Sequence, residues 1–184
     1  MQPDNYFLVS IHREENVDHP DNLAELIDGL NQLAGLYKCP VIVSTHPRTR
    51  KRLESNYQQS GDSEIIWMKP FGFHDYNRLQ LSAKCVISDS GTIAEESSIL
   101  GFPAITPRFS IERPEAMDTG AIIACGYSAG NVIRAVQLVI EQHKSNNSER
   151  SIVPEDYCIS NTSQRVINLI IGTAKLSNEW DGIR

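Results

Sequence analysis

The sequence lacks two features that mark common classes of protein, a long hydrophobic run and closely spaced cysteines. No apolar stretch approaches the roughly 18 residues that a membrane-spanning helix needs, and the opening residues lack the apolar segment of a secretory signal. The four cysteines form no C-x-x-C pair; they are Cys39, Cys85, Cys125 and Cys158. We therefore expect free thiols in a cytoplasmic protein without a membrane partner.

Positive charge is also scarce. The 17 lysines and arginines are outnumbered by 23 aspartates and glutamates, which leaves a net charge of −6. Such a balance argues against a nucleic acid as the main partner. The only dense basic stretch, residues 47–52, is explained more simply as a solvated helix face. The histidines are scattered without zinc-ligand spacing, so we expect no bound metal.

What the sequence does contain is a regular alternation of apolar runs and amphipathic stretches. The apolar runs predict strands at residues 6–11, 40–45, 64–68, 84–88, 103–106 and 121–125. The amphipathic stretches predict helices at residues 21–37, 47–57, 73–83, 92–100, 128–143 and 161–175, and a polar loop precedes the sixth strand. Uninterrupted apolar strands that alternate with helices are typical of a parallel sheet covered on both faces. We therefore predict a single Rossmann-like three-layer α/β/α domain over residues 1–184, with a leader at 1–5 and a tail at 178–184.

Charged, hydroxyl and aromatic side chains gather in the five loops that follow the first five predicted strands. The carboxyl ends of parallel strands lie at one edge of a sheet, and ligands bind outside that edge. The residues in question are His12, Arg13, Glu15, His46, Arg48, Tyr76, Ser90, Glu96 and Arg113. The loops at the opposite edge are merely polar, so we expect the functional site at the carboxyl edge.

The segment SDSGTIAEESSILG, residues 88–101, joins a predicted strand to a predicted helix through a small turn. Without a Cβ, Gly91 allows close approach to the backbone, and the amides of the turn with the helix dipole can bind an anion such as a diphosphate. Thr92 and Glu95 fit a capping box, which leaves Glu96 to accept hydrogen bonds from two vicinal ribose hydroxyls. The pattern matches neither dinucleotide-binding nor P-loop motifs, so no such cofactor is expected, and a helix start with nothing bound is an equal alternative.

Four motifs resemble those of the non-hydrolysing UDP-N-acetylglucosamine 2-epimerases. They are HREEN at 12–16, PF…Y at 70–76, SDSGTIAEE at 88–96 and ERPEAMDTG at 112–120. Their order and spacing resemble the C-terminal half of those enzymes over residues 6–126, and more loosely to about 172. The loops STHPRTRKRLE and KPFGFHDY look especially like the branch that makes UDP-N-acetyl-L-fucosamine for bacterial capsule and O-antigen.

The resemblance implies one lobe of a glycosyltransferase-B-like fold that clamps UDP between two lobes, with the N-terminal lobe absent from this chain and a homodimer possible for the whole enzyme. The resemblance also implies which residues contact each part of the ligand. Ser90, Gly91 and Thr92 would bind the phosphates, joined by Arg113 as the cleft closes, and Glu96 would bind the ribose hydroxyls. Phe71 and Tyr76 would lie on the uracil side, and His12, with Arg13 and Glu15 of the same motif, would lie at the diphosphate and sugar C1. His46 and Arg13 fall where some regulated members bind an allosteric nucleotide-sugar.

The family reaction is an elimination and re-addition of UDP that inverts C2 of the sugar. The carboxylates that move the C2 proton belong to the other lobe, so the resemblance implies that this chain alone is inactive. A lobe of a two-lobe glycosyltransferase and a non-catalytic binding module are the alternative functions.

Several candidate residues also have a purely structural alternative. These alternatives are that His12 caps the first strand, that Arg13 and Glu15 form a surface pair, that Tyr76 belongs to the core, that Glu112 and Glu115 only orient Arg113, and that His46 is bonded locally.

Overall fold

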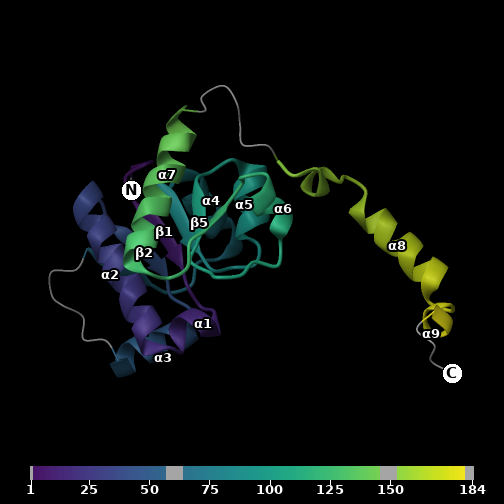
Figure 1. Ribbon diagram of the computed structural model, residues 1–184, viewed down its shortest axis with the longest axis horizontal. Helices are drawn as coiled ribbons and strands as arrows, with labels where there is room; N and C mark the ends of the chain where they lie inside the picture. The colour runs from purple at the N-terminus through teal and green to yellow at the C-terminus, as the bar shows by residue number, and fades with distance from the viewer. Residues whose placement is uncertain (1, 57–63, 146–152, 181–184) are drawn as a thin grey trace. The chain divides into compact units, whose positions relative to one another are not determined.

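The computed structural model describes residues 2–56, 64–145 and 153–180 and divides the chain into two compact units. The boundary between the units lies between Pro154 and Glu155. The first unit contains the whole sheet with helices α1 to α7, and the second contains only helical elements among its described residues (Figure 1). Most of the tail predicted at 178–184 lies outside the described residues.

Six short parallel strands form the described sheet of the first unit, in the order β3-β2-β1-β4-β5-β6. Their bounds are β1 Phe7–Ser10, β2 Val41–Ser44, β3 Ile65–Met68, β4 Cys85–Ser88, β5 Ala104–Thr106 and β6 Ile123–Ala124. The central strands are apolar and buried on both sides, as in β1, where Phe7, Leu8 and Val9 are all 0% exposed. The predicted Rossmann-like parallel sheet and its six strands are thereby confirmed.

Seven helices connect and cover these strands in the described part of this unit. Their bounds are α1 Glu14–Val17, α2 Pro20–Tyr37, α3 Pro47–Asn56, α4 Phe73–Ser82, α5 Ile93–Leu100, α6 Pro114–Asp118 and α7 Ala129–Ser145. Helices α2 and α7 pack against each other on one face of the sheet, and α4 and α5 lie on the other (Figure 1). Helices α2 and α7 can approach each other closely because Gly29 on α2 has no side chain. A Cβ at Gly29 would lie only 3.1 Å from the Cα of Ala129 on α7.

The two shortest helices of this unit were not predicted. Helix α1 has four residues and α6 has five, too few to show a helical hydrophobic period. Helix α6 lies within the stretch predicted as a polar loop before β6, so that prediction is wrong in part. Its start has a local cause, because Pro114 occupies the first helical turn, where a missing N–H costs no hydrogen bond.

The basic stretch at residues 47–52 lies in α3, and its arginines bind acidic side chains of a neighbouring segment. Arg48 pairs with Glu14 at 2.8 Å and with Asp18 at 2.5 Å, and Arg52 pairs with Asp18 at 3.1 Å. Hydrogen bonds from Arg48 lower the pKa of Asp18. The stretch is thus more than a solvated helix face.

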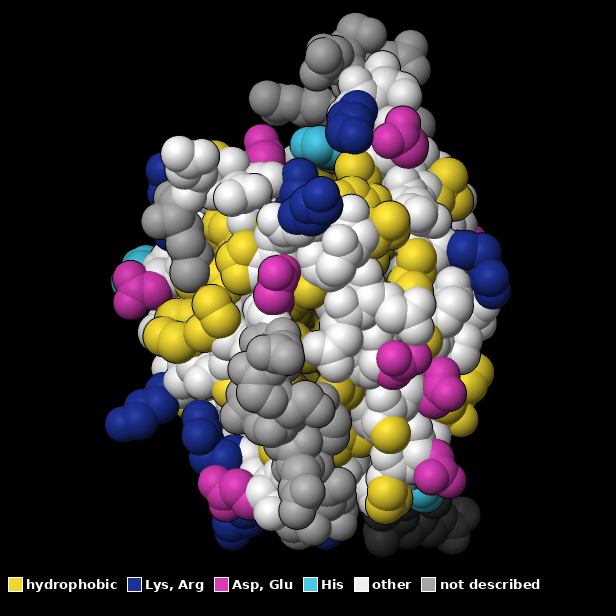
Figure 2. Space-filling view, turned by 90° about the vertical axis from the view of Figure 1, so that its left-hand side faces the viewer, with side chains coloured by type: hydrophobic (Ala, Val, Ile, Leu, Met, Phe, Trp, Pro, Cys, Tyr) yellow, Lys and Arg dark blue, Asp and Glu magenta, His cyan; other side chains and the backbone are white. Residues whose placement is uncertain are grey.

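On the face shown in Figure 2, basic and acidic side chains are interspersed with apolar ones.

Burial of the four cysteines differs, although all are free thiols. Cys39 and Cys85 are buried, Cys125 is half-buried and Cys158 is exposed. Within the described part of the chain, no group of three or more His, Cys, Asp or Glu side chains is placed to hold a metal ion. Across the same residues, no helix is both long and apolar enough to cross a membrane.

The second unit contains a short 3-10 helix at Glu155–Cys158, α8 at Thr162–Thr173 and α9 at Ser177–Trp180. A helix was predicted at 161–175, and α8 confirms that prediction. Its larger apolar side chains are exposed; they are Val166, Ile167, Leu169, Ile170 and Ile171.

Candidate anion and nucleotide site at the carboxyl edge

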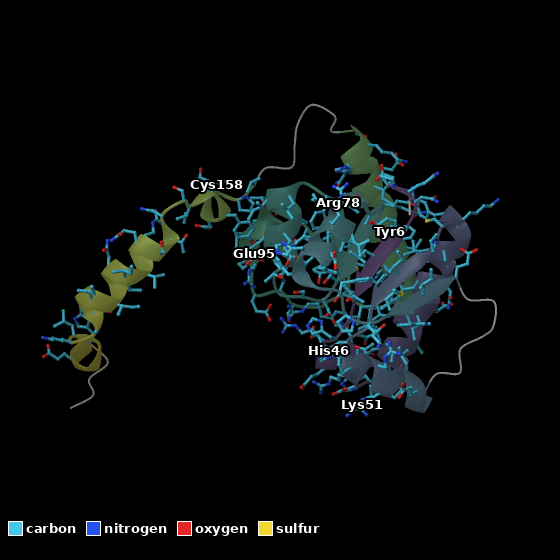
Figure 3. All side chains as sticks on the ribbon, turned by 180° about the vertical axis from the view of Figure 1, so that it is seen from behind. Tyr6, His46, Lys51, Arg78, Glu95 and Cys158 are labelled. Atoms are coloured by element: carbon cyan, nitrogen blue, oxygen red, sulfur yellow. The ribbon has the colours of Figure 1, made fainter. Side chains whose placement is uncertain are left out.

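The strand order places the loops after β1 and β4 next to each other. Ser10 and Ser88 are register partners, and the amide of Asp89 donates to the carbonyl oxygen of Ser10 at 3.1 Å. The chain continues from β1 into α1 and α2 and from β4 into α5, on opposite faces of the sheet, and ligands bind at such a switch point. In Figure 3, Tyr6 before β1 and His46 after β2 lie at opposite edges, and the His46 edge is the carboxyl one.

Asp89 joins the two loops. Its carboxylate is 0% exposed and accepts hydrogen bonds from the amides of His12 at 3.0 Å and Arg13 at 2.9 Å, and from Nδ2 of Asn16 at 2.9 Å. Burial alone would raise the pKa of Asp89, but these bonds, led by those from His12, lower it below its ordinary value. Asp89 is therefore an ionised anchor for the HREEN motif, and it was not singled out in the sequence.

Asp89 also orients the imidazole of His12. Nδ1 of His12 lies 3.1 Å from Oδ1 of Asp89, and the His12 side chain is 37% exposed. Because the carboxylate only accepts hydrogen bonds, Nδ1 is the donor and Nε2 is left for another partner. The arrangement ties His12 to the strand end, as its structural alternative required, and also holds its ring for contact with a ligand.

Two guanidinium groups converge on Gly91. A Cβ at this position would lie 3.3 Å from Nη2 of Arg13 and 3.5 Å from Nη1 of Arg113. Nε of Arg13 donates to the carbonyl oxygen of Asp89 at 3.3 Å, and Nε of Arg113 binds the carboxylate of Glu95. The absence of a side chain at Gly91 thus leaves room beside two cations at the start of α5, which is an arrangement suited to a phosphate or diphosphate.

The amides of this loop are only partly satisfied. The Ser90 N–H donates to Oγ of Ser88 at 3.2 Å, and the Thr92 N–H donates to Oγ of Ser90 at 3.4 Å. For the Gly91 N–H we find no acceptor in the described part of the chain. The long hydroxyl contacts are weak, so an anion can replace them, and the Gly91 amide has no competing acceptor among the described residues.

The predicted capping box is wrong. Thr92 has helical φ and ψ of −91° and −4° and makes no side-chain cap to the backbone. Its hydroxyl instead donates to Oε1 of Glu96 at 2.7 Å, while Glu95 binds Arg113. A guanidinium from a distant loop offers the Glu95 carboxylate a stronger, charge-assisted partner than a backbone amide of its own helix turn.

Glu96 is held by two donors. Oε1 accepts from Thr92, and Oε2 accepts from Nε2 of Gln80 on α4 at 2.5 Å. A carboxylate offers about four lone-pair sites, so two acceptor positions remain for a ligand. Gln80 was missed in the sequence because nothing local distinguishes it from the other polar residues of α4.

Tyr76 lies one helical turn before Gln80 on α4. Its hydroxyl is buried, and we find no hydrogen-bond partner for it in the described chain at normal bonding geometry, although the hydroxyls of Ser10 and Ser88 are near. Burial, with a further contribution from the charge on Glu96, raises the pKa of Tyr76 to about 12. Phe71, in the loop before α4, is half-buried. Tyr76 is therefore brought to the site as a neutral phenol.

Arg108 links the loop after β5 to α1. Arg108 is only 5% exposed and donates a hydrogen bond to Glu15 at 2.9 Å. It also forms a bidentate ion pair with Glu112 at 2.7 and 2.9 Å. Arg108 lowers the pKa of Glu112 to about 2. The alternative that Arg13 and Glu15 form a surface pair is therefore wrong, since Glu15 pairs with Arg108. The part of the other alternative in which Glu112 orients Arg113 is also wrong, because Glu112 pairs with Arg108 and, at 3.7 Å, with Arg13.

His46 lies at the rim of this site. Its ring centroid is 5.8 Å from that of His12, and its Nδ1 accepts the amide of Arg48 at 3.2 Å. The exposed His46 side chain is thus bonded locally, as its structural alternative predicted.

A family model described as UDP-N-acetylglucosamine 2-epimerase matches residues 1–171. The chain belongs to this family. An enzyme named UDP-N-acetylglucosamine 2-epimerase from Methanocaldococcus jannaschii is 35% identical over 145 residues, which are 77% of this chain and 40% of the relative. A protein named UDP-2,3-diacetamido-2,3-dideoxy-D-glucuronate 2-epimerase from Pseudomonas aeruginosa is 28% identical over 134 residues, 73% of this chain and 37% of the relative.

Solved structures of UDP-N-acetylglucosamine 2-epimerases have the same fold. The enzyme from Rickettsia bellii matches with a TM-score of 0.82 and 38% identity, over 97% of this chain and 47% of that one. The M. jannaschii enzyme in complex with UDP-GlcNAc and UDP matches with a TM-score of 0.80 and 31% identity, over 92% and 46%. The chain therefore spans less than half the length of these 2-epimerases.

Proposed function

We propose that residues 1–184 are the UDP-binding C-terminal lobe of a non-hydrolysing UDP-N-acetylhexosamine 2-epimerase. The observation that carries the proposal is the convergence of Arg13 and Arg113 on Gly91 at the start of α5. Two cations and a free amide suit the diphosphate, and Glu96 lies about one helical turn further on for the ribose hydroxyls. Membership of the 2-epimerase family supports the same ligand.

In this proposal the nucleotide extends from the loop after β4 towards α4. The contacts are Ser90, Gly91 and Thr92 for the phosphates, and Phe71 and Tyr76 for the uracil side. Arg113 approaches the phosphates as the cleft closes and then exchanges Glu95 for the ligand. Glu15 acts through Arg108, which holds α1 and the loop after β5 together.

The reaction that this lobe serves breaks the bond between sugar C1 and the β-phosphate oxygen. A base outside these residues removes the C2 proton, and the electrons of the C2–H bond form a double bond between C1 and C2. The electrons of the C1–oxygen bond leave with UDP, and a glycal-like intermediate remains. The proton then returns to the other face of C2, and UDP adds again at C1. Arg13, Arg113 and His12 stabilise the charge on the departing diphosphate, and one such donor is typically worth about 3 kcal/mol.

Without the base, the chain by itself is expected to bind UDP and to be inactive. We assign the carboxylates that move the C2 proton to an N-terminal lobe and place the whole enzyme in the cytoplasm, as a possible homodimer. The product is a UDP-activated amino sugar for bacterial surface polysaccharide. Relatives are named for different sugars, and we propose that the other lobe selects among them. His46, next to His12, is the proposed contact for an allosteric nucleotide-sugar.

Calorimetry with UDP and UMP tests the binding part of this proposal. UDP is expected to bind more tightly than UMP, and Glu96→Ala and Arg113→Ala are each expected to weaken UDP binding by about tenfold or more. Asp28→Ala, which removes an exposed carboxylate on α2, is the matched control and should leave UDP binding unchanged. Equal binding of UDP and UMP, or UDP affinity unaffected by Glu96→Ala, would contradict the assignment.

The catalytic part requires the full-length gene product. With a UDP-N-acetylhexosamine in D₂O and no acceptor, a 2-epimerase forms the C2 epimer and incorporates deuterium at C2. A glycosyltransferase lobe would give neither product, and that result would refute the proposed reaction.

A further inference from the structure

Gln80 is a fully buried amide that is satisfied at only one end. The side chain is 0% exposed, and α4, which is described throughout, buries no other residue completely. Its Nε2 donates to Oε2 of Glu96 at 2.5 Å, whereas its Oε1 has no hydrogen-bond partner in the described part of the chain. An unpartnered buried oxygen is unfavourable, so an apolar side chain of similar size would suit this position better if packing were its only role.

Helix α4 carries a second buried polar group on the same face as Gln80. Tyr76 precedes Gln80 by four residues, so the two side chains lie on one face of the helix. The Tyr76 hydroxyl, like Oε1 of Gln80, is buried without a hydrogen-bond partner in the described part of the chain. This face of α4 therefore carries two buried polar side chains, and one of them, Gln80, binds Glu96.

The two donors to Glu96 come from different elements and fix the plane of its carboxylate. Thr92, at the start of α5, holds Oε1, and Gln80, on α4, holds Oε2. A carboxylate held at both oxygens cannot rotate about its terminal bond without losing one contact. Its two unused lone-pair positions thus keep one direction, which suits a ligand with two adjacent hydroxyl donors.

We propose that Gln80 is a positioning residue that orients Glu96 and so makes the site selective for a ribonucleotide over its 2′-deoxy analogue. This inference rests on the proposed function, since it needs Glu96 to contact the ribose. Gln80 itself does not touch the nucleotide. It acts by holding Glu96 before the ligand arrives, so less orientational freedom is lost on binding.

The test is an NMR titration of the folded chain with UDP and with dUDP, each up to millimolar concentrations. We expect the wild-type chain to bind UDP about tenfold or more tightly than dUDP. In Gln80→Met, which keeps the size and removes the amide, the affinity for UDP should fall while that for dUDP stays the same. The UDP preference should therefore drop at least about threefold.

Gln32→Met is the matched control. Gln32 also donates its side-chain amide to a carboxylate, Oδ2 of Asp28, at 2.7 Å, but on the exposed face of α2. Its removal should leave both affinities unchanged.

The outcomes separate this inference from the proposed function. Three outcomes would overturn both this inference and the proposed function. They are that the wild-type chain fails to bind UDP, that it does not prefer UDP to dUDP, and that its preference for UDP survives Glu96→Ala. A wild-type preference that Glu96→Ala abolishes but Gln80→Met reduces less than about threefold would overturn only the role of Gln80. An equal loss of affinity for UDP and dUDP in Gln80→Met would do the same, because it would show a merely structural role.

A second measurement needs no substitution and covers the case in which Gln80→Met does not fold. The side-chain amide signal of Gln80 in the wild-type chain should shift on addition of UDP and shift less on addition of dUDP. A signal that responds equally to both nucleotides, or to neither, would overturn the proposal.

Discussion

Replacing Asp89 with asparagine removes a buried negative charge while keeping the shape of the side chain. In the folded chain this carboxylate receives the amides of His12 and Arg13, Nδ2 of Asn16 and Nδ1 of His12. Asparagine offers one acceptor oxygen where aspartate offers two, and its amide group points a donor at other donors. The substitution therefore leaves at least one buried donor in conflict.

The expected loss of stability follows from the number of hydrogen bonds that the substitution disturbs. Hydrogen bonds to a charged group contribute about 1.5–3 kcal/mol, and loss of one partner of a fully buried charged cluster costs about 3–5 kcal/mol. Because asparagine keeps one oxygen, we expect Asp89→Asn to lower the free energy of unfolding by about 2–3 kcal/mol. The matched control, Asp28→Asn on the exposed face of α2, should change it by less than about 0.5 kcal/mol.

Urea unfolding followed by the fluorescence of Trp67 measures this change. Trp67 lies in β3, and the second tryptophan, Trp180, can be removed by Trp180→Phe so that only the sheet unit reports. A loss below about 1 kcal/mol, or a loss equal to that of Asp28→Asn, would refute the view that Asp89 anchors the HREEN motif.

The same carboxylate makes a pH prediction. The pKa of Asp89 is lowered in the folded chain from its ordinary value of 3.8, so its contribution to stability is fully present above that value. That contribution is lost as the pH falls below 3.8 through the folded pKa. The unfolding free energies of the wild-type chain and Asp89→Asn should therefore converge under acid conditions, and a constant difference down to the lowest accessible pH would contradict this.

Two further predictions concern the neighbouring loops. Gly91→Ala should weaken UDP binding by about tenfold in calorimetry. It should change the unfolding free energy by less than about 1 kcal/mol, because the new Cβ meets only the flexible ends of Arg13 and Arg113. Unchanged UDP affinity would count against the anion site. Pairing with Arg108 lowers the pKa of Glu112 from 4.5 to about 2, so the wild-type chain loses unfolding free energy as the pH falls through this range. Arg108→Met should lose less over the same range. Equal acid sensitivity of Arg108→Met and the wild-type chain in urea unfolding would refute the pairing.

The order of strands and helices could be predicted from the sequence because it depends on local hydrophobic pattern. Uninterrupted runs such as YFLVSI and KCVIS predict buried parallel strands. One face of α2 follows from the spacing of Leu23, Leu26, Leu30 and Leu33. The sequence motifs were sufficient to indicate the 2-epimerase family, and the anion site at the Gly91 turn stays a prediction. Helices α1 and α6 were missed because four or five residues carry no helical period.

Only the tertiary structure decided which side chains meet. Strand β1 lies beside β4, although β2 and β3 come between them in the chain, and this neighbourhood brings Asp89 to His12 and Arg13. In the same way, Glu95 binds Arg113, where local spacing had suggested a helix cap, and Glu96 binds Gln80. Hydrophobic period is a property of neighbours along the chain and can be read there. Hydrogen bonds and ion pairs depend on distances in space, which are set only when the strands have been ordered and the helices packed.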